Sequence, residues 1–345
     1  MKPAIRLLFV ACLSSCASFA SHAALAQVSP AEFYKSHPVQ IVVPSSAGGG
    51  YDAIARTVQR HLGNHIPGNP TIIINNMPGA GGIREANYIY SVAEKDGSII
   101  GLMQNSIPFE PLVGNTQAAF DPRKFGWLGS PNYETGVLMV WHKAAATTID
   151  ELRNTEITVG VEAIASNPAF SARLLMQTLG LKLKLIPGYP GSAPVLLAME
   201  KGEVDAFPNF YNSAMQARPD WIRDKKTLLV AQWGPHKEKN MPDVPYIPDI
   251  VKDPDRLAVA RAGAASLALG RPFHAPPGIP ADRLAVLREG MMATFKDPAF
   301  VEETAKMGFG ELAPQSGEDL ERVIKDLYAS PPEVVEHLRK IVVGN

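Results

Sequence analysis

Short apolar runs alternate with amphipathic stretches of helix length along the first part of the chain. The runs "VQIVV" (39–43), "TIIIN" (71–75) and "SIIGLM" (98–103) are apolar on both faces, which is typical of strands in a parallel sheet. Between them, "DAIARTVQRHL" and "IREANYIYSVA" carry apolar residues at helical spacing on one side. This pattern predicts an α/β fold built from strand–helix units.

A second set of such units follows. Strands are expected at 156–161, 183–187 and 203–207, and they alternate with helices over 167–180 and 192–201. The two sets predict two α/β lobes.

The C-terminal part has a different pattern. Residues 234–255 are rich in proline and polar residues and predict an irregular segment, followed by a helix and the apolar run "GAASLALG". Beyond it, amphipathic helices are expected at about 280–296, 298–307 and 316–341.

The N-terminus has the pattern of a secretory signal. Lys2 and Arg6 precede an apolar stretch, and small residues end at an A-x-A-like cleavage site, so we expect residues 1–26 to be a signal peptide. Both cysteines, Cys12 and Cys16, fall inside it, and cleavage leaves no disulfide and no thiolate metal site. The sequence "LSSC" ending at Cys16 also resembles a lipobox, which leaves lipid anchoring open as an alternative.

Charge excludes some classes of partner. The net charge is -1 and becomes -3 when Lys2 and Arg6 leave with the signal, which argues against a nucleic-acid binder. The rest of the chain has no apolar stretch near the length of a membrane span. We expect a soluble, mildly acidic protein without a cofactor.

Two glycine-rich loops lead from a predicted strand into a predicted helix. The first is "PSSAGGGYD" (44–52) and the second is "PGAGG" (78–82). Carboxyl ends of parallel strands meet at one edge of a sheet, so both loops can face one site, where glycine allows a ligand to approach backbone N–H groups at a helix N-terminus. Neither loop has the last glycine of G-x-G-x-x-G or the G-K-[ST] of a P-loop, which disfavours a nucleotide site. The pattern favours a carboxylate ligand, and glycines that only make tight turns are the alternative.

The two loops carry a family resemblance. The segments "VQIVVPSSAGGGYDAIAR" and "NNMPGAGGIREANYIYSVAEKDGSIIGL" resemble the solute-binding receptors of bacterial tripartite tricarboxylate transporters, the Bug-type periplasmic proteins. The resemblance continues more weakly through "LIPGYPGSAPVLLAMEKGEVDAF" and "FHAPPGIPADRLAVLREGM". It implies a type II periplasmic-binding-protein fold, with lobe 1 at 28–138 plus 268–345 and lobe 2 at 139–267, joined by two crossing strands.

The same resemblance implies a function and a set of site residues. The protein would be a monomeric, non-enzymatic periplasmic receptor that closes its lobes on a small organic acid and delivers it to a permease with a large multi-span and a small four-span subunit. Its implied ligand-binding residues are Ser45, Ser46, Ala47, Gly48, Gly49, Gly50 and Tyr51 of loop one, Gly79, Ala80, Gly81 and Gly82 of loop two, and Ser166, Asn167, Tyr189, Gly191, Ser192 and Asn209 of the second lobe.

Several positions have more than one interpretation. Tyr51 stands where many relatives have a small hydroxyl residue, so it either lines the site or simply packs. Asp52 is predicted to cap its helix and pair with Arg56, and Arg84 is predicted to be a solvated arginine, with a ligand role as the alternative. The pair His61 and His65 lacks a third ligand, so no metal site is expected.

Other functions stay open at this stage. A binding protein that presents its ligand to a sensor kinase is the main alternative. A secreted hydrolase or isomerase is less favoured, because the sequence shows no catalytic motif.

Overall fold

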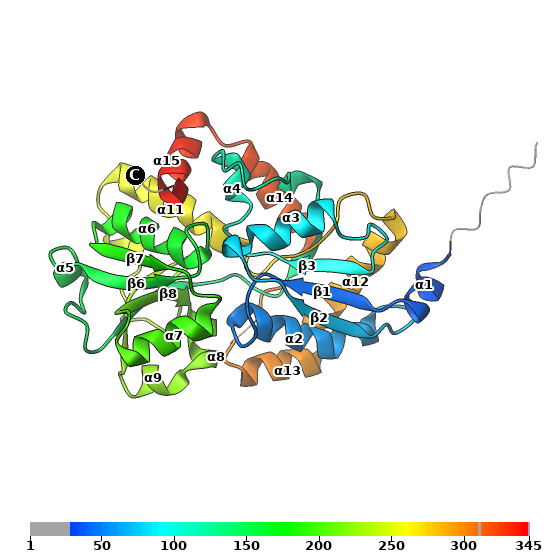
Figure 1. Cartoon of the computed structure of the whole chain (residues 1–345), viewed down its shortest axis with the longest axis horizontal. Helices are drawn as coiled ribbons and strands as arrows, with labels where there is room; N and C mark the ends of the chain where they lie inside the picture. Colours follow the sequence, from blue (N-terminus) through cyan, green and yellow to red (C-terminus); the bar gives the residue numbers. More distant parts are fainter. Residues whose placement is uncertain (1–27, 310–311, 344–345) are drawn as a thin grey trace, which may run out of the picture.

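The computed structural model describes residues 28–309 and 312–343 and contains two α/β lobes, each built around one sheet (Figure 1). The predicted signal peptide, residues 1–26, lies outside the described residues, as does Cys16. We call the layers around the six-stranded sheet the first lobe and those around the five-stranded sheet the second lobe.

The sheet of the first lobe has the order β11-β4-β10-β3-β1-β2. β1 runs parallel to both β2 and β3, and β10 runs antiparallel to β3 and β4. The strands are β1 (Val39–Val43), β2 (Ile72–Asn76), β3 (Ile99–Leu102), β4 (Gly126–Ser130), β10 (Phe273–Ala275) and β11 (Gln315–Ser316). The helices are α1 (Pro30–Ser36), α2 (Gly50–Leu62), α3 (Ile83–Ser91), α4 (Phe109–Leu112), α12 (Ala281–Lys296), α13 (Pro298–Lys306) and α14 (Gly317–Tyr328).

The sheet of the second lobe has the order β7-β6-β8-β5-β9. β6 runs parallel to β7 and β8, whereas β5 runs antiparallel to β8 and β9. The strands are β5 (Gly136–Trp141), β6 (Ile157–Val161), β7 (Leu183–Pro187), β8 (Ala206–Phe210) and β9 (Thr227–Trp233). The helices are α5 (Ile149–Leu152), α6 (Asn167–Leu179), α7 (Ser192–Lys201), α8 (Tyr211–Ala217), α9 (Pro219–Arg223), α10 (Ile247–Ile250), α11 (Pro254–Ala268) and α15 (Pro332–Val343).

The chain crosses between the lobes at 131–135, between β4 and β5, and returns at 269–272, between α11 and β10. After α14 it reaches the second lobe again, where the C-terminal helix α15 packs against α6 and α11 (Figure 1). The fold class predicted from sequence is confirmed. The residue boundaries of the two lobes stay a prediction.

Two elements differ from the sequence prediction. The strand expected at 203–207 is β8, which lies three residues later. The single helix expected over 316–341 is wrong, because the chain breaks between α14 and α15 at Ser330-Pro331. Proline at this point removes a backbone donor and its ring opposes continuation of the helix.

Apolar side chains of both sheets are buried against the helices. The apolar runs of β1 and β6 are almost entirely buried, which explains why they are apolar on both faces. Among the described residues, no helix is long and apolar enough to cross a membrane.

Candidate functional site

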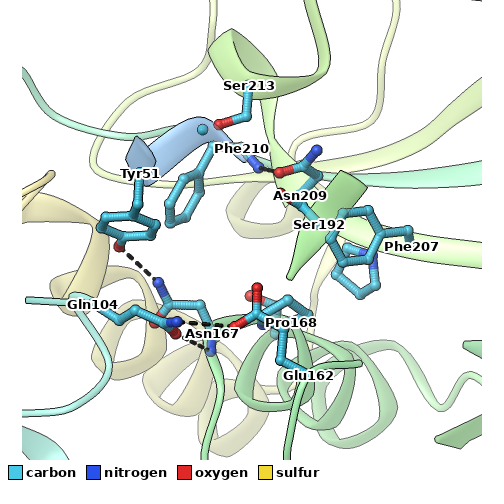
Figure 2. Close-up of a pocket in the computed structure, with 13 residues that line it drawn as sticks. Tyr51, Gln104, Glu162, Asn167, Pro168, Ser192, Phe207, Asn209, Phe210 and Ser213 are labelled. Atoms are coloured by element: carbon cyan, nitrogen blue, oxygen red, sulfur yellow. Dashed lines mark hydrogen bonds between the residues drawn. The ribbon is translucent and has the colours of Figure 1, made fainter. Parts of the chain in front are cut away.

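A cavity with about 30 Å³ of space for water-sized molecules, or about 400 Å³ when the adjoining space open to solvent is included, lies between the two lobes (Figure 2). Polar and aromatic side chains share its wall, and no lysine, arginine or histidine is among the lining residues. These are Gly50, Tyr51, Gln104, Glu162, Asn167, Pro168, Ser171, Ser192, Phe207, Pro208, Asn209, Phe210 and Ser213.

Helix N-termini from both lobes meet at this cavity. Gly50 is the first residue of α2, Asn167 of α6 and Ser192 of α7, and each helix follows a strand that ends at the same side of its sheet. None of the three helices has a capping hydrogen bond from the side chain of its N-cap residue. The positive ends of three helix dipoles therefore point toward one small volume, which favours an anion there.

Hydrogen bonds connect the lobes along the cavity wall. The Asn167 side chain donates to the Tyr51 hydroxyl (2.9 Å), and its carbonyl oxygen accepts from the backbone N–H of Ser106 (2.9 Å). Gln104 of the first lobe accepts from the backbone N–H of Asn167 and donates to Glu162 Oε2 (2.9 Å). These contacts hold the two lobes together around the cavity.

Several donors at the cavity have no acceptor in the part of the chain that the structure describes. The Tyr51 hydroxyl accepts from the backbone N–H of Asn105 and from Asn167, and burial raises its pKa, so it keeps its own hydrogen. The Ser213 hydroxyl accepts from Arg271, and Asn209 Nδ2 is buried without a partner. Such groups are costly to leave unpaired, which marks them as donors for a ligand.

A buried ion pair lies beside the cavity. Arg271, on the return crossing, pairs with Glu134, on the outward crossing, and neither side chain is exposed. The same guanidinium donates to the backbone oxygen of Gly50 (2.6 Å) and to Ser213 Oγ (2.7 Å). Arg271 thus connects both crossings to both sides of the site.

Loop one packs directly on the second lobe. A Cβ placed on Gly49 would lie 2.9 Å from Ser192 Oγ, and one on Gly191 would overlap Ser46 Oγ. The backbone N–H of Ser46 also donates to the carbonyl of Pro190 (3.3 Å). Loop one therefore brings only Gly50 and Tyr51 to the cavity wall. Ser45 is buried beneath the loop, Ala47 and Gly48 are exposed, and Gly48 N–H donates to Asp52.

Loop two lies beside the cavity rather than in its wall. Gly79, Ala80 and Gly81 line a neighbouring hollow together with Tyr189 of the second lobe, and Gly82 is the N-cap of α3. A Cβ on Gly81 would lie 2.6 Å from the backbone nitrogen of Ser166, which is itself buried. The two glycine loops thus both contact the second lobe, at different places.

Five of the predicted site residues line the cavity, and its other lining residues were not predicted from the sequence. The five are Gly50, Tyr51, Asn167, Ser192 and Asn209. Among the missed residues, Gln104 lies just past β3 and Glu162 immediately follows β6, so the rule that ligands bind at strand carboxyl ends could have found both.

Residues weighed as alternatives have structural partners. Asp52 accepts from Arg56 (2.8 Å), as predicted. The prediction that it also caps α2 is wrong, because the helix begins at Gly50 with Gly49 as its N-cap, and Asp52 in the first turn accepts from Gly48 N–H instead. Arg84 is exposed and donates to the carbonyl of Pro78. His61 contacts Glu303 and His65 contacts Asp297, and no group of metal-ligand side chains occurs in residues 28–309 and 312–343.

Two α/β lobes, repeated crossings and a polar cavity between the lobes define a binding protein of the periplasmic type. The chain belongs to the tripartite tricarboxylate transporter family receptors, whose family model matches residues 54–339. This family consists of transport receptors rather than enzymes, as predicted.

Named relatives agree with this assignment. The UPF0065 protein in the TAR-I ttuE-ttuC' intergenic region of Agrobacterium vitis is 27% identical over 285 residues, covering 80% of this chain and 76% of that protein. The periplasmic binding protein BugD has a similar fold, with a TM-score of 0.71 and 22% identity over 89% of this chain and 98% of that one. Rpa4515 of R. palustris, solved with adipate, has a TM-score of 0.69 and 20% identity over 88% and 97%.

Proposed function

We propose that this protein is a periplasmic receptor that binds a small organic acid in the cavity between its lobes. The observation that carries the proposal is the meeting of three helix N-termini at one cavity, none of them capped by the side chain of its own N-cap residue. Adipate in a protein of similar fold supports the same class of ligand.

The carboxylate is held by neutral donors rather than by a basic side chain. Asn209 Nδ2 and the hydroxyl hydrogens of Tyr51 and Ser213 are available to it, together with first-turn N–H groups of α2 and α7. In a cavity shielded from water, each hydrogen bond to a charged oxygen contributes on the order of 1.5–3 kcal/mol.

The receptor works by closure of the lobes on the ligand. Donors from both lobes face the cavity, so a bound acid favours the arrangement in which the lobes meet. The closed, monomeric receptor then delivers its ligand to a tripartite tricarboxylate-type permease.

Calorimetric titration of mono-, di- and tricarboxylates tests this proposal, with sugars as compounds that should not bind. The variant Asn209→Asp replaces an unpartnered donor by an acceptor with negative charge, and we expect it to weaken binding of any acid roughly 10- to 100-fold. The matched control is Asn64→Asp, at an exposed position in the first lobe, which should bind like the unaltered protein.

Two results would count against the proposal. One is binding of sugars with no binding of any acid. The other is unchanged acid affinity in Asn209→Asp when its thermal unfolding shows that the variant is folded.

A further inference from the structure

The cavity contains one acidic side chain in a wall of otherwise neutral groups. Glu162 lies directly after β6 (Ile157–Val161), and in Figure 2 its carboxyl points into the space that the lining side chains enclose. Its Oε2 accepts from Gln104 Nε2 at 2.9 Å. Its Oε1 has no hydrogen-bond partner among the described residues. This oxygen is therefore available to a donor on the ligand.

A plain carboxylate would meet a like charge at an ionised Glu162. Two negative groups in one small cavity repel, and the cation beside the wall, Arg271, is already paired with Glu134. A ligand with a positive group removes the conflict, because its carboxylate can face the donors and its cation can face Glu162. In Figure 2, Ser213 and Asn209 lie on one side of the cavity and Glu162 on the other.

Aromatic rings also line the cavity, and two of them already lie against a cation. These rings belong to Tyr51, Phe207 and Phe210. The guanidinium of Arg271 lies 5.6 Å from the ring centre of Tyr51 and 5.5 Å from that of Phe210. Glu162, rather than these rings, is therefore the group that a positive group of the ligand would face.

We propose that Glu162 determines specificity by pairing with a protonated nitrogen, so that the ligand of this receptor is an organic acid that also carries an amino group. This inference rests on the proposed binding of an acid in the same cavity. Burial raises the pKa of Glu162, and an ammonium group beside it would favour its charged form again.

Calorimetry with matched ligand pairs tests the inference: 4-aminobutyrate against butyrate, glutamate against glutarate, and phenylalanine against 3-phenylpropionate. For the pair that fits the cavity, the aminated acid should bind roughly 10- to 100-fold more tightly than its amine-free partner. In Glu162→Gln this preference should fall to less than about 3-fold, chiefly through weaker binding of the aminated acid.

Glu156→Gln is the matched control. Glu156 is exposed and directly precedes β6, at the opposite end of the strand from Glu162, so this variant should keep the full preference. Thermal unfolding of both variants shows whether each is folded. The comparison of ligand pairs on the unaltered protein is decisive even if Glu162→Gln does not fold.

The outcomes separate the two proposals. Tighter binding of the amine-free acids overturns the inference and leaves the receptor an organic-acid binder. A protonated Glu162 that donates to a plain carboxylate would give this result. A preference for the aminated acid that persists in Glu162→Gln also overturns the inference. Failure of every acid in all pairs and in the wider titration overturns the proposed function as well.

Discussion

Addition of a single methyl group at Gly81 tests whether loop two meets the second lobe when ligand is bound. Gly81 has left-handed backbone angles (φ 64, ψ 19), and a Cβ there would lie 2.6 Å from the backbone nitrogen of Ser166. Gly202, at the end of α7, has nearly the same angles (φ 74, ψ 23), and its Cβ would have no neighbour within 4 Å. The variants Gly81→Ala and Gly202→Ala therefore share the backbone strain and differ in the contact between lobes.

The magnitudes follow from these geometries. Left-handed angles cost an alanine about 1–2 kcal/mol, which lowers the free energy of unfolding of both variants alike. In Gly81→Ala, Ser166 must also withdraw by about 0.8 Å to reach an ordinary contact of 3.4 Å. Overpacking of this kind costs roughly 1–3 kcal/mol. If the cost arises only when the lobes meet, it weakens ligand binding roughly 5- to 150-fold.

Urea unfolding and calorimetric titration with the tightest acid from the ligand screen measure the two effects separately. We expect similar losses of stability in the two variants, and a loss of affinity in Gly81→Ala alone. Equal affinity in both variants would refute the idea that Gly81 and Ser166 approach each other in the liganded protein. A much larger loss of stability in Gly81→Ala would instead favour a purely structural role for the loop.

Two further predictions concern buried charges. Glu134→Gln leaves the buried Arg271 without its counter-charge and should lower the free energy of urea unfolding by about 3–5 kcal/mol. The control Glu318→Gln removes an exposed partner of Arg288 and should lower it by less than about 1 kcal/mol. Equal losses in the two variants would contradict the reasoning. Burial raises the pKa of Glu110 from 4.5 to about 7, so the folded chain binds more protons than the unfolded chain in that window. Stability should therefore fall by up to about 3 kcal/mol as the pH rises from 4.5 to 7, and a urea series in which Glu110→Gln shows the same fall would contradict this.

The strand–helix units were predictable because their pattern is local. The runs at β1, β2, β3 and β6 are apolar on both faces whatever strands lie beside them, so the sequence locates them to within about two residues. β8 was predicted three residues too early, because Pro208 lies inside the strand and proline normally argues against one. The ladder between β6 and β8 contains a single pair, Val159 with Ala206, so it ends before that proline.

The candidate site was partly predictable for the same reason. Sequence places helix starts such as Gly50, Asn167 and Ser192 at strand carboxyl ends, and the structure brings these three to one cavity. The pairing of Glu134 with Arg271 was not predictable, because the two residues are far apart in the sequence. Only the topology of the two crossings brings them together.

The position of Arg271 also indicates the point about which the two lobes would pivot. Its guanidinium holds Glu134, Gly50 and Ser213 at once, and a buried cation cannot lose such partners without a large cost in free energy. We therefore expect the lobes to pivot near Arg271, while contacts on the far rim, such as that between Gly81 and Ser166, open and close. This is why a methyl group at Gly81 should act on ligand affinity, whereas loss of the Glu134 charge should act on the stability of the whole protein.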